Sequence, residues 1–166
     1  MKMPNVSAVG PPSDPPPDVG ALLSACRPRT LLLLGVAEGM RLPADCVVTH
    51  CPAGASCTAL DGAARFDVVF VRGVLEGLNK AEGLRFLCRL RDFHTSRLYV
   101  WVRLDTWEEN DFFGLGMERL ALWQEGSASY GLFRFDIATY KPAPEWFNAK
   151  YWAHPELWDK YPWLPS

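Results

Sequence analysis

Runs of consecutive apolar residues predict where the strands of this sequence lie. The first run is Leu31–Leu34, and four consecutive leucines cannot form a half-exposed strand, because alternate side chains would then face water. Such a run, bounded by turn residues, fits a strand buried on both faces, as in a parallel sheet. Phe66–Val71 and Leu98–Val102 are similar runs, and Cys46–His50 indicates a further strand after the first. The pattern predicts a mostly parallel central sheet.

Apolar residues at helical spacing predict two helices around these strands. Asp18 is a typical N-cap, and the apolar residues after it recur at i, i+3, i+4 and i+7 until Pro28 ends the helix. Asn79 opens the other helix, and Glu82 three residues later completes a capping arrangement.

A third helix is predicted over Thr106–Gln124. Thr106 and Glu109 have the spacing of a capping box, acidic residues fill the first turn, and Gly126 is a stop signal. Its broad apolar face consists of Phe112, Phe113, Leu115, Met117, Leu120 and Trp123. Tyr130–Thr139 then alternates in polarity and is predicted to be an antiparallel strand at the edge of the sheet.

The composition divides the chain into three regions. Residues 1–17 are rich in proline and are predicted to be a flexible tail, and residues 18–140 form the α/β domain. Residues 141–166 combine prolines with large aromatic side chains, namely Trp146, Phe147, Tyr151, Trp152, Trp158, Tyr161 and Trp163. Exposed, these side chains would form a large apolar patch. We expect the segment either to pack back onto the domain or to mediate self-association or binding to a protein partner.

Size and charge fit a single soluble domain. The 166 residues carry a net charge of −2, which gives no electrostatic reason to expect a nucleic acid or a membrane surface as partner. No apolar run approaches the ~20 residues that a membrane span needs. The N-terminus also lacks the basic-then-apolar order of a secretory signal. We therefore expect a cytoplasmic protein.

The cysteines are expected to be reduced thiols and to hold no metal. They are Cys26, Cys46, Cys51, Cys57 and Cys88. Three of them lie near His50 in sequence, which raises the idea of a metal site, but no Cys-x-x-Cys pair is present. Buried or half-exposed thiols are the simpler interpretation.

A glycine turn follows the leucine run. Gly35 allows a sharp turn without a clash of Cβ, and Gly39 repeats the allowance four residues later. A helix N-terminus after such a turn would present free N–H groups to an anionic or polar ligand. The simpler interpretation is a buried strand that ends in an ordinary turn. The turn lacks the Lys-Ser/Thr ending of a phosphate-binding loop, which argues against nucleoside triphosphate hydrolysis.

Two segments resemble motifs of the S-adenosylmethionine (SAM)-dependent methyltransferases. LLLLGVAEG, residues 31–39, resembles their first motif, and FDVVFVRGVLEGL, residues 66–78, resembles their fourth-strand motif. The resemblance covers roughly Asp18 to Thr139 and extends to small, uncharacterised bacterial proteins of this superfamily. It implies a reduced Rossmann-like methyltransferase fold, with helices on both faces of a mostly parallel sheet. It also implies a SAM site formed by Gly35, Val36, Ala37, Glu38, Gly39, His50, Arg72 and Gly73, with Glu76 and Asp105 as further polar candidates.

The chain departs from the family pattern where the cofactor would bind. Ala37 replaces the middle glycine, Leu33 replaces the acidic residue that commonly precedes the glycines, and His50 stands where the family has a carboxylate for the ribose hydroxyls. A neutral histidine cannot offer the bidentate grip of a carboxylate. We therefore expect a protein that has lost full SAM binding and acts as a binding or regulatory module. The alternative is an active methyltransferase acting on a small molecule. No catalytic residue can be assigned from the sequence.

Overall fold

The computed structural model describes residues 16–54, 58–62 and 64–140. Its helices are α1 (Val19–Ala25), α2 (Lys80–Arg89) and α3 (Glu109–Phe113), and its strands are β1 (Thr30–Gly35), β2 (Val47–Cys51), β3 (Val68–Arg72), β4 (Arg97–Arg103), β5 (Glu118–Glu125) and β6 (Ala128–Asp136). The tail predicted over residues 1–17 lies almost wholly outside the described residues, and the segment 141–166 lies entirely outside them. No helix among the described residues is long and apolar enough to cross a membrane.

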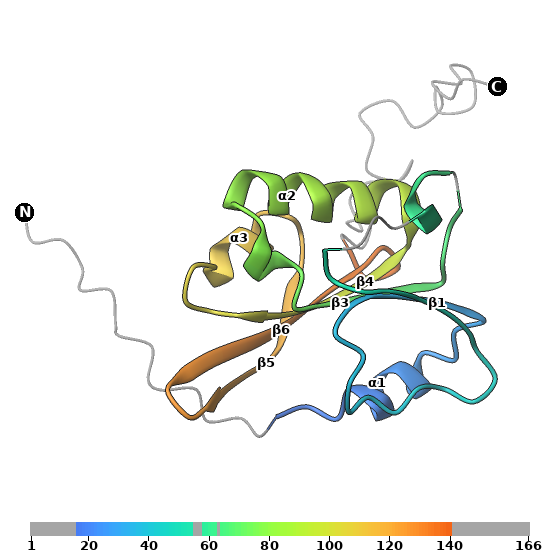
Figure 1. Ribbon diagram of the computed structural model, residues 1–166, viewed down its shortest axis with the longest axis horizontal. Helices are drawn as coiled ribbons and strands as arrows, with labels where there is room; N and C mark the ends of the chain where they lie inside the picture. The colour runs from blue at the N-terminus through green and yellow to red at the C-terminus, as the bar shows by residue number, and fades with distance from the viewer. Residues whose placement is uncertain (1–15, 55–57, 63, 141–166) are drawn as a thin grey trace, which may run out of the picture.

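One six-stranded sheet organises the domain, with the strand order β2-β1-β3-β4-β6-β5 (Figure 1). The first four of these strands are mutually parallel, and β6 runs antiparallel to both β4 and β5. Leu31–Leu34 pairs in parallel with Val68–Val71, residue for residue. The prediction of a mostly parallel sheet, built on two buried runs lying side by side, is confirmed.

Helices cover both faces of the sheet, as predicted. Figure 1 shows α2 and α3 on one side and α1 on the other. Strand residues alternate accordingly: Leu32 and Leu34 of β1 belong to the core under α2 and α3, whereas Leu31 and Leu33 belong to the core under α1. Because both faces are covered, all four leucines are buried, which is why the sequence shows a continuous apolar run there.

Two helix starts follow the caps that the sequence predicts. The Asp18 side chain accepts a hydrogen bond from the Ala21 N–H at 3.0 Å and begins α1. Asn79 and Glu82 form a reciprocal capping box at the start of α2. The helix α2 continues into a π-helical turn, Leu90–His94, before β4 begins.

The prediction of a single helix over Thr106–Gln124 is wrong. The segment forms the short helix α3 and then strand β5. Asp111, rather than Glu109, accepts the backbone N–H at the start of α3. The chain then turns at Gly116, whose φ is +76°, a conformation that L side chains rarely adopt. The apolar residues of this segment therefore pack on opposite faces of the sheet: Phe112 of α3 belongs to the core on the α2 side, and Trp123 of β5 belongs to the core on the α1 side.

The position predicted for the last strand needs a smaller correction. β6 is antiparallel, as expected, but it lies between β4 and β5, so β5 is the edge strand. Its residues alternate between the two cores, with Phe133 on one face and Leu132 on the other. The edge prediction failed because β5 itself was taken for a helix.

Candidate functional site

The glycine turn at the end of β1 packs closely against the end of β3. Gly35 has φ +95°, and a Cβ atom at this position would overlap the carbonyl oxygen of Arg72. The Val36 N–H donates to that same oxygen at 2.8 Å. A Cβ on Gly73 would in turn meet a methyl group of Val36 at 2.8 Å. Gly35 and Gly73 are thus needed for contact between two backbone segments.

No helix follows this turn in the structure. Residues 36–46 form turns and irregular chain up to β2. The segment packs on the α1 face, where Ala37 and Met40 join the core and Arg41 contacts Gly20 of α1. The helix N-terminus that would present free N–H groups to an anionic ligand is therefore not formed here.

His50 and Arg72 hold this loop from the neighbouring strands. The carbonyl oxygen of Gly35 accepts a hydrogen bond from His50 Nε2 at 2.8 Å, so Nε2 carries the proton. Arg72 Nη1 donates to the carbonyl oxygen of Glu38 at 3.3 Å, and its guanidinium lies 4.5 Å from the ring centroid of Trp101. The backbone of Glu38, rather than its carboxylate, makes the contact with Arg72.

The structure thus brings the eight predicted site residues together around one turn. Val36 is 40% exposed, and Glu38 and Gly39 lie at the surface beside it. Gly39 has open space around its Cα. The hydrogen bonds from His50 and Arg72 to backbone carbonyl oxygens fix the loop on the α1 face of the sheet. Whether they also touch a cofactor stays a prediction.

The two further polar candidates lie at the end of β4. Glu76 accepts the backbone N–H of Arg103 at 3.3 Å, and Asp105 pairs with the Arg103 side chain at 2.7 Å. The backbone N–H of Thr106, assisted by the charge of Arg103, holds the pKa of Asp105 below its usual range. Asp105 therefore stays ionised and is poorly suited to act as a general acid or base near neutral pH.

A cavity of about 460 Å³ lies on the opposite side of the same strand ends. Its wall combines the end of β1 and β2, the chain after β2, and α2: Leu34, Cys51, Pro52, Ala53, Gly54, Leu60, Asp61, Val74, Leu78, Phe86 and Arg89. The lining is mainly apolar, and the Arg89 guanidinium is fixed by a 2.8 Å hydrogen bond to the Leu60 carbonyl oxygen. Its volume is within the range of small-ligand pockets.

Sequence reasoning missed this cavity. None of the eight predicted residues lines it, because His50 and Arg72 point to the α1 face while Cys51 and Val74 belong to the core under α2. Ligands of open α/β sheets bind beyond the carboxyl ends of the strands, so the residues just after Cys51 could have been singled out. Phe86 and Arg89 carry no such signal, since only the packing of α2 brings them there.

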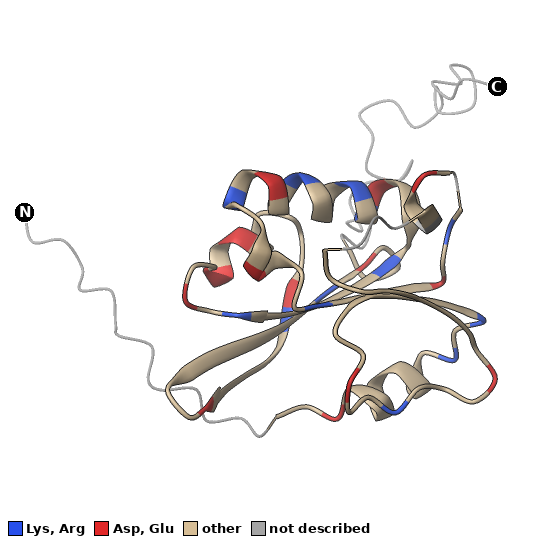
Figure 2. Ribbon diagram, viewed as in Figure 1, with Lys and Arg blue, Asp and Glu red and all other residues tan. Residues whose placement is uncertain are grey.

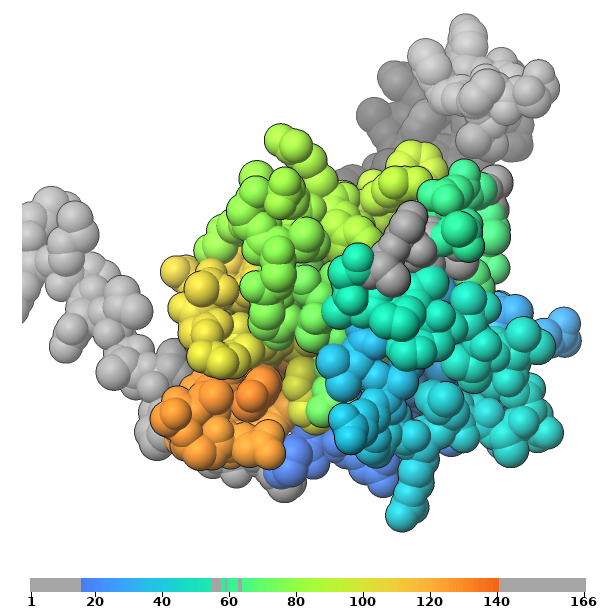
Figure 3. Space-filling model, viewed as in Figure 1, coloured from blue at the N-terminus to red at the C-terminus, as the bar shows by residue number. Residues whose placement is uncertain are grey.

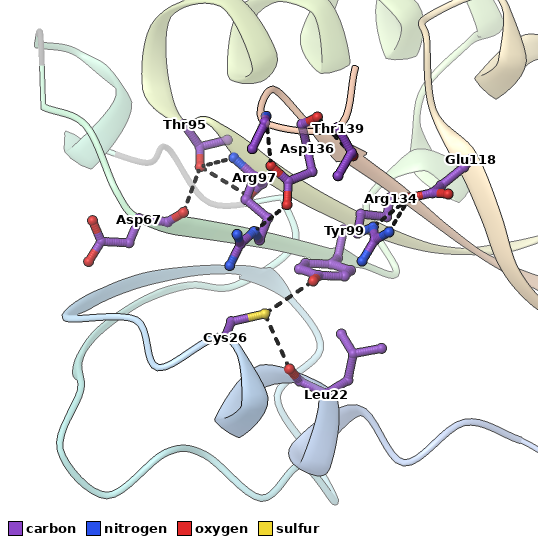
Figure 4. Close-up of polar contacts among 11 residues, drawn as sticks. Leu22, Cys26, Asp67, Thr95, Arg97, Tyr99, Glu118, Arg134, Asp136 and Thr139 are labelled. Atoms are coloured by element: carbon purple, nitrogen blue, oxygen red, sulfur yellow. Dashed lines mark hydrogen bonds and ion pairs between the residues drawn. The ribbon is translucent and has the colours of Figure 1, made fainter. Parts of the chain in front are cut away.

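A separate polar cluster joins the end of α1 to the amino-terminal half of β4 and the carboxy-terminal end of β6 (Figure 4). The Cys26 thiol donates to the Leu22 carbonyl oxygen at 3.2 Å and lies 3.1 Å from the Tyr99 hydroxyl. Because the thiol hydrogen is already used, the Tyr99 hydroxyl donates to sulfur. Burial, followed by this hydrogen bond, raises the pKa of Tyr99. The cluster therefore keeps the Tyr99 phenol neutral, and it fastens α1 to the sheet.

The cysteines are only partly as predicted. Cys26, Cys46 and Cys88 are free thiols, whereas Cys51 takes part in a disulfide, so the expectation of reduced thiols throughout is wrong for Cys51. Burial, with a smaller effect of Asp67, raises the pKa of the Cys46 thiol, which makes it a poorer nucleophile near neutral pH. Among the described residues no cluster of three or more His, Cys, Asp or Glu side chains could hold a metal ion.

Solved structures share this fold at low sequence identity. The N-terminal domain of EvdMO1 with S-adenosylhomocysteine (SAH) bound has a TM-score of 0.54 and 11% identity, over 75% of this chain and 82% of that one. The magnesium protoporphyrin IX methyltransferase ChlM from Synechocystis PCC 6803 with bound SAM has a TM-score of 0.54 and 14% identity, over 71% and 76%. The chain therefore has a methyltransferase-like α/β fold, as its two motifs implied.

Sequence comparison leads to a family rather than to a characterised protein. No curated protein matches the chain in sequence. A family model described as "Family of unknown function (DUF6231)" matches residues 13–163.

Proposed function

Because this chain belongs to the family of unknown function DUF6231, we propose a function from the geometry of its own site. The protein is a methyltransferase-fold binding module that has lost full SAM binding at its glycine turn and receives a small, largely apolar ligand in the cavity beside α2. It acts through binding, as a regulatory module, rather than through methyl transfer.

The observation that carries this proposal is that neighbouring residues of the protein already bond to the backbone of the glycine turn and fill the space beside it. The Gly35 carbonyl oxygen is bonded to His50, the Val36 N–H is bonded to the Arg72 carbonyl oxygen, and the space beside Gly35 is filled by that same oxygen. A turn that receives a ligand needs free backbone groups and open space. At the end of β2, His50 offers no carboxylate for ribose hydroxyls.

Isothermal titration calorimetry with SAM and with SAH tests the proposal. We expect no saturable heat with either ligand up to millimolar concentration, and no rise in Tm. A dissociation constant in the micromolar range for either compound would overturn the loss of SAM binding. The variant His50→Asp is the informative companion, since it restores a carboxylate at the end of β2. Appearance of binding only in this variant would identify the missing carboxylate as the cause.

An active SAM-dependent methyltransferase acting on a small molecule is the second candidate. It is supported by the fold shared with ChlM and by a cavity at the carboxyl ends of β1 and β2. If SAM binds in that cavity, Leu78→Trp should abolish binding by filling it, while Arg72→Ala on the other face should not. The reverse outcome would place the cofactor at the glycine turn.

Partners and location belong to the same proposal. A module that works through binding needs a partner, and the aromatic segment 141–166 is the candidate surface for a protein or a second copy of the chain. We propose that the module works in the cytoplasm. Light scattering of the purified protein across a concentration series tests self-association: a dimer mass that appears with rising concentration would support a second copy as the partner, and a constant monomer mass would exclude it.

A further inference from the structure

A further hollow lies between α3 and the start of β5, and it shares no lining residue with the cavity beside α2. It is a groove of about 900 Å³ with apolar residues in its wall, among them Leu104, Trp107 and Met117. Phe113 adds a ring that is 45% exposed. Figure 3 shows α3 (yellow) at the surface, between α2 (green) and the β5–β6 hairpin (orange). The groove is mixed in polarity, and Phe113 supplies most of its exposed apolar surface, since Trp107 and Met117 are almost fully buried.

The described chain ends beside this groove. The Tyr140 ring packs directly on Gly116 and lies 5.3 Å, centroid to centroid, from the ring of Phe135. Tyr140 also lines a smaller hollow whose wall shares Met117 and Glu118 with the groove. Residues 116–118 therefore lie between the last described residue and the groove.

Residues 141–166 have the composition and the length to fill it. Their first large aromatic residue, Trp146, follows Tyr140 by six positions and can reach up to ~20 Å from it. Tryptophan and tyrosine rings supply large apolar area, and each carries an N–H or O–H donor at its edge.

The rim of the groove offers acceptors for such donors. Glu108, Glu109 and Glu118 line it, and only Arg119 brings a positive charge. Arg119 is paired with Glu109 at 2.8 Å and Arg134 with Glu118, so two of the three glutamates are already ion-paired and act as acceptors rather than as free charges. The acidic character of α3 is visible in Figure 2. Residues 141–166 hold Lys141, Lys150 and Lys160 but also Glu145, Glu156 and Asp159, so the segment carries no net charge, and its aromatic donors rather than its charge fit these acceptors.

We propose that the groove between α3 and β5 is the docking site of this chain's own final segment, residues 141–166. The segment turns back after Tyr140 and places an aromatic side chain against the exposed Phe113 ring, with the N–H or O–H donor of that side chain directed at the carboxylates of the rim. This inference does not depend on whether SAM binds, so the two can fail separately.

Photo-crosslinking in the full-length chain tests the assignment. Phe113 is replaced by the photoreactive amino acid p-benzoylphenylalanine, and in a matched control Val47, which is 70% exposed on the opposite edge strand β2, is replaced in the same way. An equal mixture of isotope-labelled and unlabelled chains is irradiated, and the products are mapped by mass spectrometry. We expect crosslinks from position 113 to residues 141–166 of the same chain, and none to that segment from position 47.

Two outcomes would overturn the proposal. Crosslinks that join labelled to unlabelled chains would assign the groove to a second copy. Absence of any product between position 113 and residues 141–166 would remove the segment from the groove.

Hydrogen exchange gives an independent readout. Trp146, Trp152, Trp158 and Trp163 are replaced together by serine, and amide exchange is compared with that of the unmodified chain. We expect exchange in residues 109–119 to become at least ten-fold faster, with β1 and β3 unchanged. Equal exchange in residues 109–119 of both proteins would contradict docking there.

Discussion

The two halves of the sheet are held together in different ways. In the half formed by β2, β1 and β3, backbone meets backbone: Gly35 approaches the Arg72 carbonyl oxygen so closely that no side chain fits between them. In the half formed by β4, β6 and β5, aromatic rings fill the space, as where Phe112 stacks on Phe133 with centroids 4.2 Å apart. The first kind of contact depends on a missing side chain and the second on a large one. A larger side chain should therefore destabilise the contact in the first half, and a smaller side chain should destabilise the contact in the second half.

The largest effect is expected at Gly35. Gly35→Ala should lower the free energy of unfolding by about 4 kcal/mol, because the new methyl group overlaps backbone and φ is +95°. Urea unfolding followed by circular dichroism measures this. Gly39→Ala is the matched control: φ is +75° but nothing lies within 4 Å, so about 1 kcal/mol is expected. Equal losses would mean that the close approach at Gly35 does not matter.

The second effect concerns the aromatic half. Phe112→Ala should cost about 3 kcal/mol, because the ring is fully buried between Trp107 and Phe133. The neighbouring Phe113, 45% exposed, is the control, and Phe113→Ala should cost about 1 kcal/mol in the same urea experiment. A smaller loss at position 112 than at 113 would contradict the packing described for α3.

A smaller effect is expected where His50 fastens the glycine turn. His50→Ala removes the hydrogen bond to the Gly35 carbonyl oxygen and should cost about 1 kcal/mol. His50→Gln keeps an N–H donor and should recover part of that loss. If the two variants unfold at the same urea concentration, the hydrogen bond to the Gly35 carbonyl oxygen makes no measurable contribution to stability.

The smallest expected effect on the unfolding free energy concerns Tyr99 and appears only at alkaline pH. Burial and the hydrogen bond to Cys26 raise the pKa of Tyr99, whereas an unfolded tyrosine ionises near pH 10. The stability that the neutral phenol contributes is present below that pH and is lost as the pH rises above it. The unfolding free energy should therefore fall as the pH rises above 10, and that of the Tyr99→Phe variant should fall by about 1 kcal/mol less by pH 11. Parallel declines of the two proteins would show that Tyr99 ionises freely in the folded state.

The same contrast explains what the sequence could predict. Leu31–Leu34 and Val68–Val71 are buried on both faces, so their local pattern has one interpretation, and β1 and β3 follow it. Phe112, Met117 and Trp123 are spaced in a way that fits one amphipathic helix as well as a turn between a short helix and a strand. Gly116 decides between them, and a single glycine is a weak signal in a sequence.

The site was predictable to a similar extent. Gly35, His50 and Arg72 were expected to meet at the strand ends, and they do meet, because parallel strands deliver their last residues to a common edge. The face of the sheet to which each side chain points depends on the exact register of its strand, because a shift by one residue moves the side chain to the opposite face. The cavity also needs Phe86 and Leu60, which only tertiary packing brings together.

The π-helical turn at the end of α2 carries one more residue than a regular helix would need. Thr95 N donates to the Leu90 carbonyl oxygen at 3.1 Å, His94 is buried with Nδ1 3.0 Å from the Ala64 carbonyl oxygen, and the His94 carbonyl oxygen accepts the Phe66 N–H. Deletion of one residue from this turn would restore ordinary helical winding and rotate the His94 imidazole by about 100°, away from the Ala64 carbonyl oxygen. The chain just before β3 would then lose its contacts with His94, so the extra residue of the π-helical turn sets the length that this connection needs in order to hold the entrance of β3.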